Sequence, residues 1–137
     1  MPTSSYTAIA GSRELLVEGI NAGTDQWAIC LASSVPGSTT FVSGTTDLAT
    51  SGGYTAGGNN VSTTSSAESA GVYKLILADP SVWTATGGGF TFQYALLVNK
   101  TNNYVIGYWN YGSSQAVASG ETVTIDLDGS AGVIQVS

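Results

Sequence analysis

The sequence predicts an all-β, single-domain protein with an antiparallel β-sandwich or jelly-roll architecture of about eight strands. Apolar and polar residues alternate over short runs rich in β-branched and aromatic side chains, which is typical of strands. Turn residues, among them many of the 18 glycines, separate these runs. A chain of 137 residues is the size of one domain and can bury a core without disulfides or metals. We expect residues 1–12 to form an N-terminal arm or extended segment, and residues 13–137 to form the β-sandwich domain.

The first half of the chain contains four segments with a structural preference. Arg13–Ile20 (RELLVEGI) is short and fits either a strand or a short helix. Asp25–Ala32 alternates large apolar with small side chains, which predicts a strand buried on both faces. We expect these two segments to pair as a hairpin around a glycine-containing turn. Thr45–Thr50 could form one helical turn, and Val61–Ser66 is β-prone.

The second half shows clearer strands. Val72–Ala78 alternates and ends at an Asp-Pro pair, which interrupts a strand. Phe90–Asn99 has the strongest strand pattern of the chain, and Tyr104–Tyr111 follows a polar turn as its antiparallel partner. Thr122–Leu127 alternates in the same way, and Gly132–Val136 is expected to form the final strand.

The alternation within the Phe90–Asn99 strand predicts which side chains enter the core. Every second residue from Phe90 to Val98 is apolar or aromatic, so we expect these residues to share one face. Contact between the rings of Tyr94 and either Tyr108 or Trp109 would stabilise the hairpin. The core of this region is expected to contain Trp83, Phe92, Tyr94 and Leu96.

The charge balance excludes several classes of partner. The formal net charge is −6, and the only basic residues are Arg13, Lys74 and Lys100. Nucleic-acid binding requires clustered cations, so we expect no nucleic-acid partner. Binding to an anionic membrane is disfavoured for the same reason, and no apolar run approaches the ~20 residues that span a bilayer. The first ten residues lack the features of a signal peptide, so we expect the chain to be made and kept in a cytosol unless it leaves within a larger assembly.

The residue types present also argue against catalysis. The chain has no His and a single Cys, which excludes a zinc site and a Ser-His-Asp arrangement. We interpret Cys30, in an apolar stretch, as a buried and unreactive thiol. Glycoside hydrolysis needs two facing carboxylates, and the nine Asp and Glu residues form no tight motif. A small acidic glycosidase is the one enzyme alternative that remains. We expect no catalytic residue, no cofactor-binding residue, no metal-binding residue and no cofactor.

Two short patterns resemble ligand-binding loops only in part. Asp126 and Asp128 precede Gly129 as in the start of a calcium loop, but the remaining ligands are missing. A hairpin turn is the preferred interpretation. The glycines of Gly87–Gly89 and Ser51–Gly58 lack the Lys-Ser or Lys-Thr of a phosphate loop, so they are interpreted as positions of positive φ or close packing.

The surface composition favours binding or assembly. Charged residues make up 9% of the chain, against roughly 25% in an ordinary soluble domain. A surface with so little charge is poorly protected against association, although a monomer coated with hydroxyl groups would have the same composition. Aromatic side chains could instead serve as rigid anchors for a glycan or a protein, with about half of them in the core. The candidates for this role are Tyr54, Tyr104, Tyr108, Trp109 and Tyr111.

Three stretches of the chain, in order, carry a resemblance to a known family. They are TTDLATSGGYTAGG (residues 45–58), DPSVWTATGGGFTFQY (79–94) and VIGYWNYGSSQAVASGETV (105–123), followed by the closing DLDGSAGVIQVS. Together they resemble small virion proteins of tailed bacteriophages, whose members carry a GY-x-x-GG block, a V-x-W before an aromatic strand and an IGY strand. The chain has Thr46 and Asp47 where Glu is usual and Glu121 where Asp is usual. The resemblance covers residues 45–137, and its motifs are structural.

The resemblance implies a structural component of the virion with no catalytic residues. Within that class we expect a capsid decoration, or cement, protein that binds the major capsid protein and itself, as a dimer or trimer, and stabilises the phage head. It would be made in the host cytoplasm and would lie on the capsid exterior. The alternative is a tail or fibre component that recognises a receptor glycan through its aromatic residues.

Overall fold

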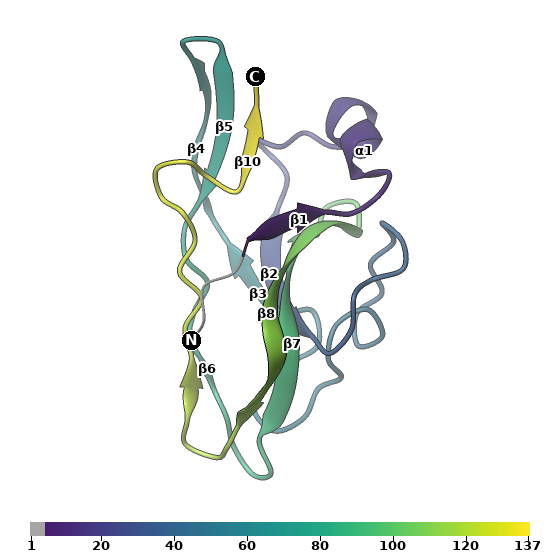
Figure 1. Cartoon of the computed structure of the whole chain (residues 1–137), viewed down its shortest axis with the longest axis vertical. Coiled ribbons are helices and arrows are strands. Elements are labelled where there is room, and N and C mark those ends of the chain that lie inside the picture. The colour runs from purple at the N-terminus through teal and green to yellow at the C-terminus, as the bar shows by residue number, and fades with distance from the viewer. Residues whose placement is uncertain (1–4) are drawn as a thin grey trace.

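The computed structural model describes residues 5–137, and within that range it is mostly β, with one short helix (Figure 1). The prediction of a predominantly β chain is confirmed. The elements are β1 (Tyr6–Ala8), α1 (Ser12–Glu18), β2 (Trp27–Ala32), β3 (Asn59–Val61), β4 (Thr63–Ser69), β5 (Val72–Leu77), β6 (Trp83–Thr84), β7 (Phe90–Asn99), β8 (Tyr104–Val117), β9 (Thr122–Val123) and β10 (Ile134–Val136).

The strands form three open antiparallel sheets. The largest has five strands in the order β1-β8-β7-β2-β3, a second has the order β10-β5-β4, and β6 pairs with β9. In Figure 1, β4, β5, β10 and β6 lie on one side of the five-stranded sheet. The strands β7 and β8 form the long hairpin that the sequence predicts, joined by the turn at residues 100–103.

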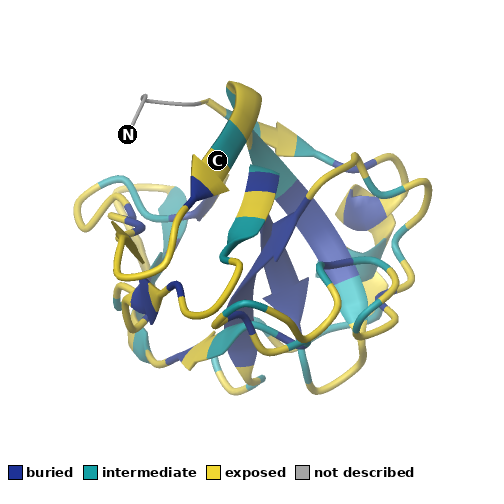
Figure 2. Ribbon diagram, turned by 90° about the horizontal axis from the view of Figure 1, so that it is seen from below, coloured by how far each residue is buried: buried dark blue, intermediate teal, exposed yellow. Residues whose placement is uncertain are grey.

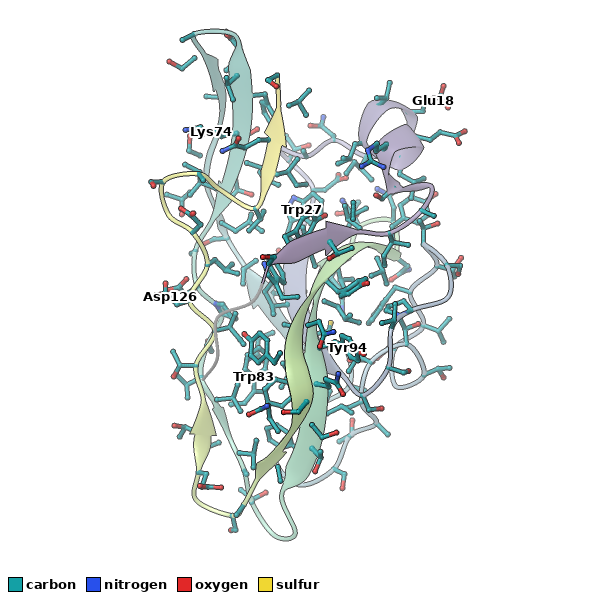
Figure 3. The ribbon with its side chains drawn as sticks, viewed as in Figure 1. Glu18, Trp27, Lys74, Trp83, Tyr94 and Asp126 are labelled. Carbon is teal, nitrogen blue, oxygen red and sulfur yellow. The ribbon has the colours of Figure 1, made fainter. Side chains whose placement is uncertain are left out.

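The main core lies between the five-stranded sheet and the two smaller sheets. Buried side chains from all three sheets meet there, among them Trp27 of β2, Leu75 of β5 and Trp83 of β6. Figure 3 shows Trp27 and Trp83 inside this layer. Seen end-on, the buried strands occupy the centre and exposed loops surround them (Figure 2).

A second, smaller core covers the opposite face of the five-stranded sheet. It contains Cys30 and Ala32 of β2, and Phe41 from the long loop that follows β2 packs onto them. All six residues of β2 are buried, with the large side chains in the main core and those of Cys30 and Ala32 in the second. This confirms the expectation of a strand buried on both faces.

The predicted faces of β7 are correct only in part, because an irregularity interrupts the strand. The register with β8 shifts between Phe92 and Tyr94, where Phe92 lies opposite Gln115 and Tyr94 lies opposite Asn110. Phe92 faces the main core, whereas Tyr94 and Leu96 face the second core. A bulge of this kind exchanges the two faces of a strand, because side chains alternate with a period of two.

The core prediction holds for three of its four members. Trp83, Phe92 and Leu96 are buried, and Tyr94 is only partly buried. The rings of Tyr94 and Tyr108 do meet, with centroids 5.8 Å apart, but the two residues are diagonal neighbours rather than directly opposite.

Three further local expectations are wrong or incomplete. Arg13–Ile20 does not pair with β2, because it contains helix α1, whose Ser12, Leu15 and Leu16 face inward at helical spacing. The turn expected at Thr45–Thr50 closes earlier in the chain, where the N–H groups of Thr45 and Thr46 both donate to the carbonyl of Val42. Thr122–Leu127 keeps its alternating burial, but only its first two residues pair as a strand.

Part of the segment expected as an N-terminal arm belongs to the fold. The strand β1 pairs with β8, with Tyr6 opposite Trp109 and Ala8 opposite Gly107. Ile9 is buried in the second core. Residues 1–4 lie outside the described range.

Candidate functional site

A buried polar cluster, which we name the Asp47 cluster, holds the long loop 33–58 against β2. Asp47 is 5% exposed, and its Oδ2 accepts hydrogen bonds from the Tyr54 hydroxyl at 2.5 Å and the Gly57 N–H at 2.7 Å. Its Oδ1 accepts from the Gly44 N–H at 2.6 Å. The Tyr54 oxygen in turn accepts from the N–H of Leu31 in β2, at 3.1 Å. Both carboxylate oxygens and the phenol are thus satisfied within the protein, which makes the cluster a structural one.

Cys30 and Lys100 extend the Asp47 cluster. The Cys30 thiol donates to the carbonyl of Gly57 at 3.3 Å, and Lys100 Nζ donates to the same carbonyl at 3.1 Å. Burial raises the pKa of the Cys30 thiol to about 12, with a further contribution from Asp47. Burial also raises the pKa of Tyr54. Both groups stay protonated near neutral pH, and the expectation that Cys30 is buried is confirmed.

Several of the remaining carboxylates accept hydrogen bonds from backbone N–H groups. Asp128 Oδ1 accepts from the N–H groups of Ser130 and Ala131 at 2.8 and 2.7 Å, and these bonds lower the pKa of Asp128. Asp126 is exposed and lies before the turn at residues 129–131 that Asp128 closes. Asp79 and Glu121 likewise accept from the N–H groups of Leu127 and Ala118. Within residues 5–137, no three His, Cys, Asp or Glu side chains lie together in a way that could hold a metal ion.

The aromatic side chains suggested as glycan anchors are engaged in packing. Tyr54 is 1% exposed and belongs to the main core. Trp109 contacts Tyr6 with ring centroids 5.3 Å apart, and Tyr111 contacts Phe92 at 5.7 Å. Tyr104 and Tyr108 are also partly buried. The structure therefore does not gather these five residues into one exposed platform.

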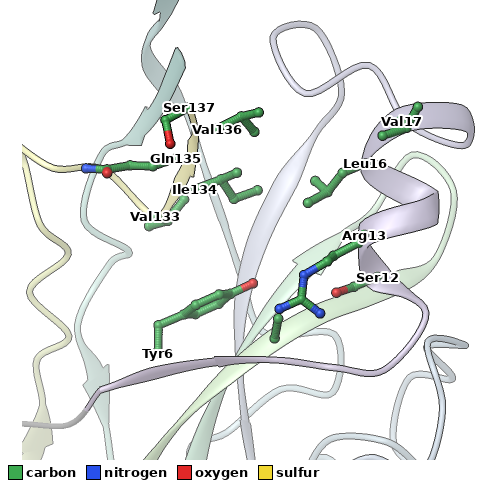
Figure 4. A pocket seen from close by; sticks show the side chains of 11 residues that line it. Tyr6, Ser12, Arg13, Leu16, Val17, Val133, Ile134, Gln135, Val136 and Ser137 are labelled. Atoms are coloured by element: carbon green, nitrogen blue, oxygen red, sulfur yellow. The ribbon is translucent and has the colours of Figure 1, made fainter. Parts of the chain in front are cut away.

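An open pocket lies where the first and last described elements of the chain meet, and we name it the terminal pocket (Figure 4). Its volume is about 620 Å³, within the usual range of ligand pockets. Tyr6 and Ala8 of β1 form one wall, the inner side of α1 forms the second, and residues 133–137 form the third. The helix contributes Ser12, Arg13, Leu16 and Val17.

The terminal pocket contains one cation among mostly apolar groups. Among residues 5–137, Arg13 is the only Lys or Arg that lines it, and no Asp or Glu side chain does so. Tyr6 faces Arg13, and burial raises the pKa of Tyr6 to about 12, although the Arg13 charge opposes the shift. Ser12 is fully buried, and its hydroxyl has no hydrogen-bond partner within the described range, residues 5–137. Such a group carries a desolvation cost that a bound acceptor would relieve.

Sequence reasoning did not identify the terminal pocket. The sequence indicates Arg13 only as a basic residue at the start of a short strand or helix, and residues 133–137 only as part of a strand. The pocket forms because β1 and β10 are brought together from opposite ends of the chain, and no local pattern encodes that contact. The unpaired Ser12 is likewise a product of the tertiary fold.

Comparisons with known proteins leave the function to be argued from the structure. No protein-family description, no curated protein and no solved structure matches this chain. Across the described part of the chain, no helix is long and apolar enough to cross a membrane.

Proposed function

We propose that this chain is a non-enzymatic structural protein of a tailed-phage virion, a decoration protein on the capsid exterior. It binds the major capsid protein and copies of itself, and so stabilises the head. We propose a β-sandwich or jelly roll as its finer architecture. The proposal combines the resemblance carried by residues 45–137 with the way in which the sheets end.

The observation that carries the proposal is the nearly uncharged set of sheet edges. The terminal strands of the two larger sheets are β1, β3, β4 and β10, and Glu68 in β4 is their only charged residue. None of the four contains Pro. Natural monomers protect such edges with charges, prolines or very short strands, because an open edge pairs readily with another chain. The strands β1, β3 and β10 are short but carry neither charge nor proline, which supports a protein whose edges are covered in its working state.

A repeating shell is a suitable partner for such a surface. Each contact of a small domain with the shell can be weak, because neighbouring contacts raise the effective concentration of the next one. The Asp47 cluster and the acidic turn residues are used within the fold, which fits a protein whose role is to present a rigid surface.

The test is to add the purified chain to particles that lack it and to measure occupancy on separated heads and tails. We expect the chain to bind heads at a fixed ratio to the major capsid protein and to slow their disruption on heating. Retention on tails with no binding to heads would overturn the proposal in favour of the tail or fibre alternative. Release of a sugar product from host glycans would overturn the non-enzymatic assignment.

A further inference from the structure

The terminal pocket is bounded by two open sheet edges. The strand β1 ends the five-stranded sheet, and β10 ends the three-stranded sheet. An edge strand presents N–H and C=O groups that can hydrogen-bond an added strand. Tyr6 and Ala8 of the first edge, and Ile134 and Val136 of the second, all line the pocket. The Tyr6 side chain stands across one opening from Ile134 and Val136 (Figure 4).

Apolar side chains line the pocket and extend onto its rim. Leu16 of α1 and Ile134 of β10 are partly or fully buried at its inner side. Val17 is 84% exposed and Val136 is 54% exposed, and both line the opening. A single exposed valine is ordinary, but these residues form one apolar lining with Leu16 and Ile134, and a contiguous apolar patch marks a surface that binds another chain.

The polar groups of the terminal pocket favour a carboxylate. Arg13 belongs to a chain of net charge −6, yet no hydrogen bond or ion pair within residues 5–137 engages its guanidinium group. The buried, unpartnered hydroxyl of Ser12 lies next to Arg13 in the same pocket (Figure 4). A guanidinium and a neighbouring hydroxyl donor together match the two oxygens of a carboxylate.

We propose that the terminal pocket is a strand-addition groove for an extended peptide segment of a partner protein that carries Asp or Glu beside apolar residues. The segment would pair with the open edge of β10, as in other complexes in which a peptide extends a sheet. Its alternate apolar side chains would contact Leu16, Val17 and Ile134, and its carboxylate would accept hydrogen bonds from Arg13 and Ser12. The groove is the contact through which the capsid partner would be held, and to that extent the inference rests on the proposed function.

The direct test uses short synthetic peptides and the full chain. The probe is the capped peptide acetyl-VTVDV-amide, compared with acetyl-VTVNV-amide and with a VTVDV peptide N-methylated at alternate backbone nitrogens. We expect the Asp probe to bind at millimolar concentrations or below, and to slow hydrogen exchange of the backbone amides of β10. The Asn probe should bind about tenfold more weakly, because it loses the charge-assisted contact. The N-methylated probe should not bind, because it lacks the backbone donors.

Matched variants assign the binding to this pocket. Arg13→Glu should weaken binding of the Asp probe by about tenfold or more, whereas Lys74→Glu, the same charge change outside the pocket, should leave it unchanged. Val17→Asp should weaken binding, whereas Val82→Asp, at another exposed valine, should not. Circular dichroism of each variant confirms that the fold is retained. Absence of binding by the Asp probe, or equal binding by the Arg13→Glu and Lys74→Glu variants, would overturn the groove.

Binding of the same variants to particles separates the groove from the proposed function. If Arg13→Glu loses head binding and Lys74→Glu keeps it, both the groove and the decoration role are supported. Equal head binding by the Arg13→Glu and Lys74→Glu variants would overturn the groove and leave the decoration role standing. Probe binding without head binding would support the groove and overturn the decoration role. A change from oligomer to monomer in Arg13→Glu, with head binding intact, would identify a second copy as the occupant and overturn the assignment to a partner protein.

Discussion

Tyr54 and the glycines around it show why the block at residues 45–58 has its spacing. Tyr54 lies seven residues after Asp47 and donates its hydroxyl proton to that buried carboxylate. Gly52 and Gly58 both have positive φ, and a Cβ atom there would collide with the backbone carbonyls of Gly89 and Ile29. The block therefore packs a loop closely against β2 and against the segment just before β7, in agreement with the structural interpretation of its motif.

The first prediction concerns the Tyr54 hydroxyl. Tyr54→Phe should lower the free energy of unfolding by about 1–3 kcal/mol, because the change leaves a buried carboxylate and the Leu31 N–H with one partner fewer. Urea unfolding measures the difference. Tyr73→Phe is the matched control, since the Tyr73 hydroxyl meets Ser66 at an exposed position and its loss should cost less than about 0.5 kcal/mol. Equal losses in the two variants would contradict the role given to the Asp47 cluster.

The second prediction concerns stability at alkaline pH. The Cys30 thiol ionises near its ordinary pKa of 9.0 in the unfolded chain, whereas the folded chain raises this pKa to about 12. The folded state therefore holds more protons in this window, so the stabilisation is complete below about pH 9 and is lost as the pH rises toward about 12, by up to about 1.4 kcal/mol per pH unit. In urea unfolding, the free energy of unfolding of the Cys30→Ala variant should fall less steeply with rising pH than that of the parent chain. Parallel curves for the two proteins would contradict this.

At the scale of elements, the sequence predicts strands well where alternation and burial coincide. Phe90–Asn99 forms as expected, and Asp25–Ala32 forms a strand over Trp27–Ala32, because each run places apolar groups at a period of two. The exchange of faces within β7 could not be predicted, because it depends on the register shift opposite Tyr111–Ser114 of β8. Arg13–Ile20 is ambiguous for a different reason. A run of eight residues fits both the strand period and the helix period, so tertiary contacts decide which structure forms.

The third prediction tests the face assignment of β7. Phe92→Ala should cost about 3–5 kcal/mol of unfolding free energy, because Phe92 is fully buried in the main core. Thr91→Ala, the neighbouring exposed position, should change it by less than about 0.5 kcal/mol. Urea denaturation at constant pH measures both. Similar midpoints for Phe92→Ala and the parent chain would show that this side chain is not in the core.

The fourth prediction concerns β1. Deleting residues 1–10 should destabilise the fold, because the deletion removes the strand that pairs with β8, buried Ile9 and the contact of Tyr6 with Trp109. We expect a lower melting temperature together with reduced binding to heads. The variant Ile9→Ala separates the effect of packing from that of strand pairing, because it retains β1. It should lower the free energy of unfolding by about 2–5 kcal/mol. An unchanged melting temperature after the deletion would restore the simple arm predicted from the sequence.

At the scale of the whole molecule, the class of fold was predictable and the order of its strands was not. Composition and turn spacing indicate a β chain, but β2 lies between β7 and β3, partners that are distant in sequence. The terminal pocket has the same origin, since Arg13 and Ile134 meet only through the assembled sheets. Local patterns determine which residues face inward, whereas long-range pairing determines which edges remain open. The terminal pocket depends on long-range pairing, so local patterns could not predict it.

The last prediction concerns association and net charge. The chain carries −6 at pH 7 and approaches zero charge near its pI of about 4.1, so mutual repulsion between copies should disappear there. Because its sheet edges carry almost no charge, we expect light scattering to show reversible growth in particle mass as the pH falls toward 4, while circular dichroism still reports a folded β protein. Replacing exposed Glu14 and Glu18 by Gln removes two negative charges, from −6 to −4, and should move the onset of association to higher pH. A chain that stays monomeric through its pI would instead favour the monomer coated with hydroxyl groups, and the edges would then be protected by means other than charge.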